Sequence, residues 1–160
     1  MRGQTFVLGA ISLALSFLLL MPAVQKDLYL PTLGEESLQN VAGSYNSWIA
    51  YQSLEGIGET SSFGRFVKGE YPHLEIFYVL ADGKTLSLAN FFDSTRSVSL
   101  EGGEVLLDSG EVKRFSCGKS VSMTFEGRNI SYEPQSALSG AIFISGGLEG
   151  ARLEILRIYK

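Results

Sequence analysis

Apolar residues follow three successive spacings along this chain, and each spacing predicts a different element. The first is an unbroken stretch: from Gln4 to Gln25 there is no charged residue, and most positions are apolar or small. A helix of these 22 residues spans roughly 33 Å at about 1.5 Å per residue, close to the roughly 30 Å hydrocarbon layer of a bilayer. We therefore expect residues 4–25 to form a transmembrane helix that anchors the chain.

The second spacing predicts an amphipathic helix over residues 34–53. Thr32 and Glu35 have the spacing of a capping box, which marks a helix start, and Gly56 marks its end. Between them, apolar residues recur at steps of three and four: Leu38, Val41, Ala42, Tyr45, Trp48 and Ile49. This spacing gives the helix one apolar face. We expect Trp48 and its aromatic neighbours to pack on a sheet rather than to stack on a ligand.

The third spacing has a period of two and predicts strands from residue 74 onward. Residues 74–80 and 85–88 flank Asp82-Gly83, a pair that favours the tight turn of a β-hairpin. Similar segments follow, mostly separated by turns with glycine: 97–100, 105–107, 112–116, 121–125, 130–132, 141–145 and 152–159. We predict an α+β fold with an N-terminal hydrophobic transmembrane helix, one amphipathic helix, and an antiparallel β-sheet or β-sandwich domain of about eight strands.

Length and charge divide the chain into an anchor and one domain. A chain of 160 residues has room for one ordinary domain, which we place at residues 26–160. The whole chain has 13 Lys and Arg against 17 Asp and Glu, which give a net charge of −4. It has no basic cluster, so no nucleic-acid partner is expected. Arg2 precedes the hydrophobic segment, whereas the opposite charges of Lys26 and Asp27 after it cancel. The positive-inside rule therefore puts the N-terminus in the cytoplasm and the domain outside.

The chain has one cysteine, Cys117, and one histidine, His73. A single cysteine excludes an intramolecular disulfide and a cysteine-based zinc site. No pattern around Cys117 lowers its pKa, so we expect a small buried hydrophobe rather than a nucleophile. His73 follows Pro72 at a strand entrance, where a surface position is expected. The alternative is that Cys117 and His73 form a catalytic dyad. We expect instead that the chain is not an enzyme and binds no cofactor.

Two further groups of polar residues are of types found in glycosylation sites and in calcium sites. Asn129-Ile130-Ser131 is an acceptor sequence for N-glycosylation in a predicted turn, which makes Asn129 a glycosylation candidate outside the membrane. Four carboxylates in neighbouring turns are of the type that binds Ca²⁺: Glu101, Glu104, Asp108 and Glu111. They lack the spacing of an EF-hand, so we expect solvated turn charges and no metal.

The tripeptide Arg2-Gly3-Gln4, followed directly by an uncharged hydrophobic segment, resembles the class III signal of archaeal type IV pilins and related pilin-like proteins. The resemblance covers about 25 of the 160 residues. It implies that a prepilin-type peptidase cuts between Gly3 and Gln4, which removes the leader of residues 1–3 and leaves the hydrophobic helix on the mature chain. Many pilins have Glu as the fifth mature residue, whereas this chain has Leu8. That departure is consistent with a minor or non-polymerising member.

Small residues within the hydrophobic segment predict a face for helix packing. Gly9, Leu13 and Ser16 fall near one face of a helix, and Ala10 and Ala14 lie beside it. Small residues let helices approach closely in lipid, so this face is a candidate contact with a helix of another subunit. The alternative is that the spacing of these small residues has no functional role.

These patterns and the resemblance predict a membrane-anchored, pilin-like structural subunit of a type IV pilus-like surface filament, active in adhesion or assembly. Its expected partners are membrane lipid, other pilin-like subunits or further copies of itself, and the prepilin-type peptidase. The alternative is a non-polymerising single-pass membrane protein whose extracytoplasmic β domain binds a surface partner or glycan. A cleaved secretory signal is not favoured, since Met21-Pro22-Ala23 matches a small-x-small cleavage site poorly.

Overall fold

The computed structural model describes residues 34–56, 58–134, 138–148 and 151–160, which contain two helices and nine strands. Residues 34–55 are helical (the long helix), and α2 (Ser62–Glu70) follows. The strands are β1 (Leu74–Ala81), β2 (Thr85–Phe91), β3 (Arg96–Leu100), β4 (Gly103–Leu107), β5 (Val112–Ser116), β6 (Val121–Phe125), β7 (Arg128–Tyr132), β8 (Ser139–Leu148) and β9 (Ala151–Tyr159). The chain divides into two compact units, Met1–Glu36 and Ser37–Lys160. Of the first unit, only helical residues 34–36 belong to the described part.

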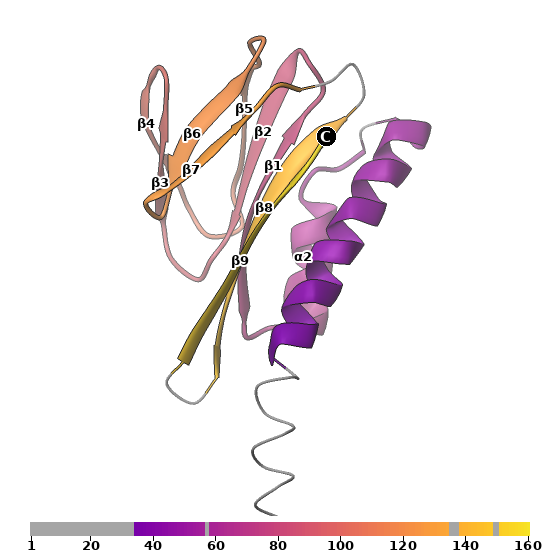
Figure 1. The fold of residues 1–160 in the computed structure, drawn as a ribbon, viewed down its shortest axis with the longest axis vertical. Helices are drawn as coiled ribbons and strands as arrows, with labels where there is room; N and C mark the ends of the chain where they lie inside the picture. Colours follow the sequence, from indigo (N-terminus) through magenta and orange to yellow (C-terminus); the bar gives the residue numbers. More distant parts are fainter. Residues whose placement is uncertain (1–33, 57, 135–137, 149–150) are drawn as a thin grey trace, which may run out of the picture. The chain divides into compact units, whose positions relative to one another are not determined.

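The nine strands form two antiparallel sheets that pack face to face (Figure 1). The strand order is β5-β2-β1-β8-β9 in the five-stranded sheet and β4-β3-β6-β7 in the four-stranded sheet. The long helix and α2 cover the face of the five-stranded sheet that points away from the four-stranded sheet. The unit Ser37–Lys160 therefore has three layers: helices, five-stranded sheet and four-stranded sheet.

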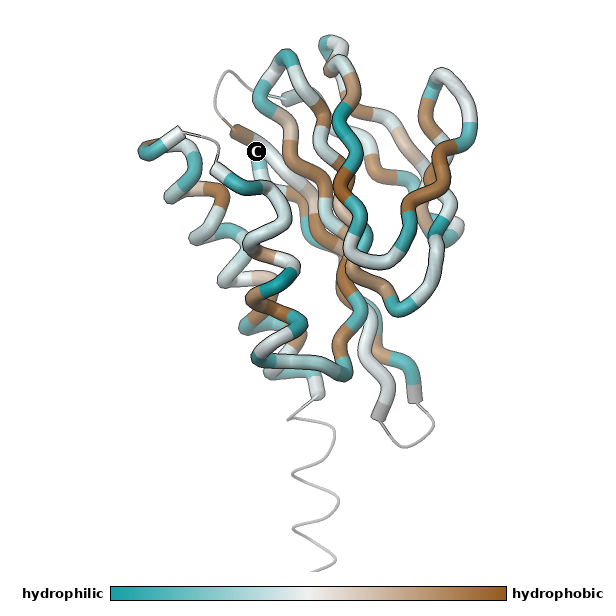
Figure 2. Tube along the Cα trace, turned by 180° about the vertical axis from the view of Figure 1, so that it is seen from behind, coloured by the Kyte–Doolittle hydropathy of each residue, from teal (hydrophilic) through white to brown (hydrophobic). Residues whose placement is uncertain are grey.

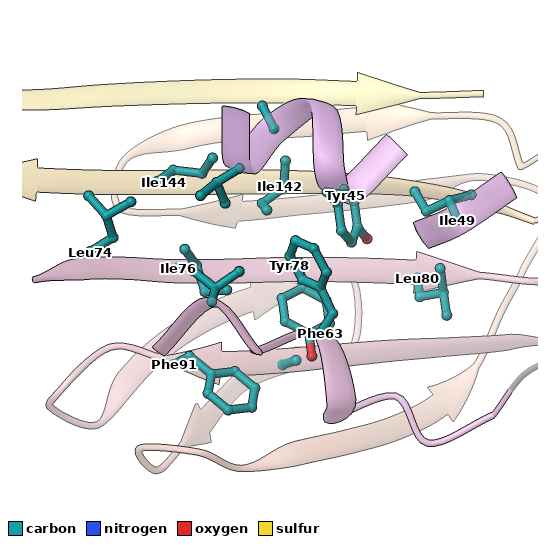
Figure 3. Packing of buried hydrophobic residues seen from close by; sticks show 14 of the residues in the cluster. Tyr45, Ile49, Phe63, Leu74, Ile76, Tyr78, Leu80, Phe91, Ile142 and Ile144 are labelled. Atoms are coloured by element: carbon teal, nitrogen blue, oxygen red, sulfur yellow. The ribbon is translucent and has the colours of Figure 1, made fainter. Parts of the chain in front are cut away.

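Strand β1 lies in the middle layer and is buried on both faces. Ile76, Tyr78 and Leu80 pack toward the helices, whereas Phe77 and Val79 pack toward the four-stranded sheet. Side chains alternate between the two faces of a strand, so a strand covered on both sides carries apolar residues at nearly every position. The uninterrupted apolar run from Ile76 to Ala81 in β1 is the result, and Figure 3 shows the side that faces the helices.

A group of phenylalanine rings fills the space between the two sheets. Phe77 of β1 stacks on Phe125 of β6 with ring centroids 4.0 Å apart, and Phe125 makes an edge contact with Phe143 of β8 at 5.4 Å. Phe92, just after β2, makes a further edge contact with Phe125 at 5.6 Å. Figure 2 shows the apolar segments of the strands in brown. Aromatic pairs of this kind stabilise a core beyond the effect of their buried area.

Three tyrosine hydroxyls tie the helices to the five-stranded sheet. Tyr45 of the long helix donates to the carbonyl oxygen of Val79 in β1 at 2.6 Å, and Tyr159 of β9 donates to a main-chain carbonyl of the long helix at 2.7 Å. Tyr78 of β1 donates to the carbonyl oxygen of Thr60, just before α2, at 2.6 Å. The bonds of Tyr45 and Tyr78 are buried and give buried polar groups their partners, whereas that of Tyr159 is partly open to water. Together they fix where the helices lie along the strands.

Two glycines make room for the helices to lie this close. A Cβ at Gly140 of β8 would lie 2.6 Å from the Tyr45 hydroxyl and 2.6 Å from the Val79 carbonyl oxygen. A Cβ at Gly64 of α2 would lie 2.1 Å from the ring of Phe91. Both positions therefore require a residue without a side chain.

The fold class predicted from the sequence is wrong in its count of elements. The structure has a second helix, α2, beyond the single amphipathic helix that the spacing predicts. It has nine strands in two sheets, where the prediction was a sheet or sandwich of about eight strands. At nine residues, α2 is too short for a clear period. It is stabilised by the burial of Phe63 and Val67 against the five-stranded sheet.

The prediction of a transmembrane helix is also not supported by the described residues, among which no helix is both long enough and apolar enough to cross a membrane. The long helix is amphipathic, with polar residues such as Gln39 and Asn40 exposed. The expected leader of residues 1–3 and the expected span of residues 4–25 lie outside the described part.

Gly140→Ala should destabilise the chain, because the added methyl group displaces Tyr45 from Val79. We expect the free energy of unfolding to fall by about 1–3 kcal/mol, as at other overpacked sites. Urea unfolding followed by the fluorescence of Trp48, the single tryptophan, measures this change. Gly147→Ala on the same strand is the control, since a Cβ there meets no atom within 4 Å. Equal stability of the two variants would contradict the role given to Gly140.

Candidate functional site

The exposed face of the long helix carries no charge between its acidic ends, Glu35 and Glu36 at the start and Glu55 at the end. Residues 37–54 contain no Asp, Glu, Lys or Arg. The exposed residues of this stretch, here called the uncharged face, are Gln39, Asn40, Gly43, Ser44, Asn46, Ser47, Ala50, Tyr51, Ser53 and Leu54. Surface helices ordinarily direct charged side chains toward water, whereas the centres of protein interfaces are depleted of charge. The uncharged face is therefore a candidate contact surface.

A groove lies between the uncharged face and α2. It has a volume of about 610 Å³, with small residues along one wall and aromatic residues in its floor and other wall. The residues that line it are Gly43, Ser44, Ser47 and Trp48 from the long helix, and Ser62, Phe63 and Phe66 from α2. No charged side chain takes part in this lining. The groove therefore suits an apolar or hydroxyl-bearing partner.

Three large apolar side chains project from the two helices beside the groove. Leu54 is 86% exposed, Tyr51 is 58% exposed and Phe66 is 53% exposed. Tyr51 and Leu54 are three residues apart and so neighbour each other on the last turns of the long helix, whereas Phe66 borders the groove. Single exposed apolar residues are common, but a group of them beside an apolar groove marks an interaction site.

An aromatic cluster beneath the groove holds the helices in place. The ring centroid of Phe63 lies 5.1 Å from that of Tyr45, 5.5 Å from that of Trp48 and 5.6 Å from that of Tyr78. Figure 3 shows Tyr45, Phe63 and Tyr78 lying close together. Burial raises the pKa of Tyr45 and of Tyr78 well above the usual value, so both hydroxyls stay protonated and act as structural donors. The expectation that Trp48 and its flanking tyrosines pack against a sheet is confirmed for Tyr45, which is fully buried, and holds in part for Trp48, which is half-buried against this cluster. It is wrong for Tyr51, which is 58% exposed.

The structure places Cys117 and His73 in different cavities. Cys117 follows β5 and lines a cavity beside Phe115. It is half-buried there rather than fully buried, and burial raises the pKa of its thiol. His73 lines a surface cavity together with Glu75 and Arg152. The structure does not bring the two residues of the alternative dyad together.

Three of the four carboxylates expected in turns accept local hydrogen bonds. Glu104 accepts one from the Ser97 hydroxyl, and Asp108 accepts one from a threonine hydroxyl at 2.8 Å. Glu111 accepts one from the main-chain N–H of Asp108 at 2.8 Å. In the described part of the chain, no group of three or more His, Cys, Asp or Glu side chains is arranged to hold a metal ion.

Asn129 lies in a strand rather than in the predicted turn. It belongs to β7, an edge strand of the four-stranded sheet. Ile130 and Tyr132 pack into the core between the sheets, so the alternate residues of β7 point outward. Asn129 is accordingly exposed, and its side-chain oxygen accepts a hydrogen bond from the Thr124 hydroxyl at 2.9 Å. Its accessibility keeps it a candidate for glycosylation.

The other site residues expected from the sequence lie outside the described part: Gly3, Gln4, Gly9, Ala10, Leu13, Ala14 and Ser16. The uncharged face and the groove are additions from the structure. The missing charge over residues 37–54 is a signal that the sequence contains. The groove, however, requires the placement of α2 beside the long helix, which no local pattern indicates.

No protein-family model, no curated protein and no solved structure matches the chain. The uncharged face and the groove are thus the features on which a functional assignment depends. Neither contains a charged residue, a histidine or a cysteine. They are therefore suited to binding by shape and apolar contact rather than to acid–base or nucleophilic catalysis.

Cys117 should react with thiol reagents only at a higher pH than an ordinary cysteine does. Its raised pKa keeps the thiol protonated, and only the thiolate reacts. The rate of alkylation by iodoacetamide, measured against pH, should therefore have a higher midpoint in the folded chain than in the same chain unfolded in urea. A folded midpoint at or below the unfolded one would contradict the half-buried position of the thiol.

Proposed function

We propose that this chain is a pilin-like structural subunit of a surface filament. The observation that carries the proposal is the uncharged face with its groove, which offers another chain a contact surface along the described helix. The resemblance of Arg2-Gly3-Gln4 to a class III signal points in the same direction. In this proposal, the uncharged segment 4–25 holds the chain in membrane lipid before assembly, and the β-sandwich lies outside the cell. A prepilin-type peptidase is the processing partner, and the subunit has no catalytic role.

When another chain covers the uncharged face, the free-energy cost of removing water from it is low. Burial of apolar surface such as that of Leu54 and Tyr51 stabilises a complex by about 25 cal/mol per Å². Charged side chains would oppose this gain through their desolvation, whereas the serine and amide side chains of the face need only hydrogen-bond partners. The expected contact is heterologous, because a head-to-tail contact that does not close extends into a filament.

The outer face of the four-stranded sheet has a different character that suits exposure to water. Its outward side chains, which alternate with buried ones, are polar apart from the exposed Leu106 of β4. The polar ones are Ser97, Ser99, Glu104, Ser122, Thr124, Asn129 and Ser131. This face belongs to the layer farthest from the helices. A glycan on Asn129 would therefore project from the assembled subunit without covering the groove.

The mature N-terminus tests the processing step. We expect mass spectrometry of the chain from native cells to find Gln4 as its first residue. Gly3→Val should leave the leader attached, because it removes the glycine of the resembled cleavage motif, and filaments containing the chain should then be lost. A native chain that still begins with Met1 or Arg2 in filaments would contradict pilin-type processing. A membrane-bound chain in cells without filaments would favour the non-polymerising alternative.

Ser47→Lys should block assembly without unfolding the chain. Ser47 is exposed in the wall of the groove, so a lysine there remains solvated in the monomer but loses water when another chain covers it. Electron microscopy of filaments from native cells measures the effect. Ser99→Lys, on the outer face of the four-stranded sheet, is the matched control and should leave filaments intact. Filaments of normal yield from Ser47→Lys would refute the groove as an assembly contact.

A further inference from the structure

Strand β9 is an open edge of the five-stranded sheet and the longest edge strand of the described part. Its nine residues pair with β8 in one continuous register, and the two strands form one long hairpin (Figure 1). The other edge strands, β4, β5 and β7, have five residues each. Within the described ranges, β9 makes no main-chain hydrogen bond beyond its pairing with β8. A long edge of this kind presents unpaired main-chain donors and acceptors, which are a template for another strand.

Apolar side chains of β9 are open on their outer flank. Ile155 and Leu156 are half-buried, whereas their partners on β8, Ile144 and Phe143, are fully buried. Ile155 packs toward the helices, and Leu156 packs toward the four-stranded sheet. Both faces of β9 therefore carry apolar surface that a further strand would remove from water.

The end of β9 carries two positive charges without an ionic partner. Arg157 and Lys160 are exposed, and neither forms an ion pair with another described residue. Glu154, the acidic side chain of β9, already pairs with Arg152 at 3.0 Å and with Arg128 of β7 at 2.7 Å. This edge is therefore positive although the whole chain has a net charge of −4. Its charge favours an acidic partner.

The edge strands of a second copy do not supply that partner. The charged side chains of β5 and β7 are all basic, and a second β9 would bring the same unpaired cations together. β4 carries Glu104, but its main chain is not open, because the Lys113 ammonium donates to the Leu106 carbonyl oxygen at 2.6 Å. The complementary strand therefore belongs to a different chain.

We propose that β9 is a docking edge for an extended acidic segment of a different protein, which adds a strand to the five-stranded sheet. Main-chain hydrogen bonds to β9 provide the affinity, and carboxylates beside Arg157 and Lys160 select an acidic segment. This contact does not depend on the filament contact, since the groove is formed by the two helices.

A short peptide of alternating valine and glutamate, blocked at both ends, is the probe for strand addition. Its binding to the full isotope-labelled chain in a neutral detergent is followed by nuclear magnetic resonance. We expect the amide signals of β9 to shift during the titration, and to shift more than those of β4, β5 and β7. The same peptide with an N-methyl group on every residue is the control. It keeps the charges but has no main-chain donor, so it should not bind.

Arg157→Glu tests the choice of an acidic partner. It should weaken binding of the valine–glutamate peptide by about threefold or more, because like charges on neighbouring strands repel. Lys119→Glu is the matched control, since it changes the net charge equally in the segment between β5 and β6, at the other end of the sheet order. Lys119 is exposed and forms no ion pair within the described ranges. This variant should bind the peptide as the natural chain does.

Three results would overturn the inference. Equal binding of the N-methylated peptide would show that charge alone attracts the probe. Equal affinities of Arg157→Glu and Lys119→Glu, or a titration that leaves the β9 signals unchanged, would exclude β9 as an acidic docking edge. Shifts of the β9 signals with protein concentration, in the absence of peptide, would show that a second copy occupies the edge.

Discussion

The hydrogen bond from the Tyr45 hydroxyl to the Val79 carbonyl oxygen, made in the space left by Gly140, is the constraint on which the unit depends. The main chain of β1 is already paired with β2 on one side and with β8 on the other. A helix reaches that main chain only through a side chain that fits between the strands, and the missing side chain of Gly140 provides the space. Once Tyr45 is fixed, the rotation of the long helix is set. Ser47, Tyr51 and Leu54 are then directed outward.

The five-stranded sheet contributes side chains to two hydrophobic cores, one on each face, and this arrangement holds the helix layer in a fixed position. Its phenylalanines pack on the four-stranded sheet, while Tyr78 and its neighbours pack on the helices. The hydroxyl of Tyr78 also accepts the main-chain N–H of Gly64 at 3.3 Å, which attaches α2 to the same strand. Both walls of the groove are therefore tied to one sheet. A partner that binds there meets a surface whose shape is already formed, which limits the entropy lost on binding.

Much of the strand arrangement was predictable because period two and turn glycines are local signals. The Asp82-Gly83 hairpin between β1 and β2 is confirmed, and every predicted strand segment coincides with a strand of the structure. Strand order was not predictable, since the pairing of β1 with β8 joins residues far apart in the sequence. α2 escaped prediction because its short apolar face is stable only against the sheet. The groove depends on both of these long-range placements.

In the proposed subunit, the uncharged face and the groove are turned toward other chains, and the hydroxyl-rich outer face of the four-stranded sheet is turned toward water. Hydroxyl-radical footprinting, read by mass spectrometry, tests that orientation most directly. It compares the chain in native membranes or filaments with the same chain dispersed in detergent. We expect Tyr51 and Phe66 to be protected in the native state, while Leu106 of β4, 59% exposed, is labelled equally in both. Equal labelling of Tyr51 and Phe66 in the two states would contradict it.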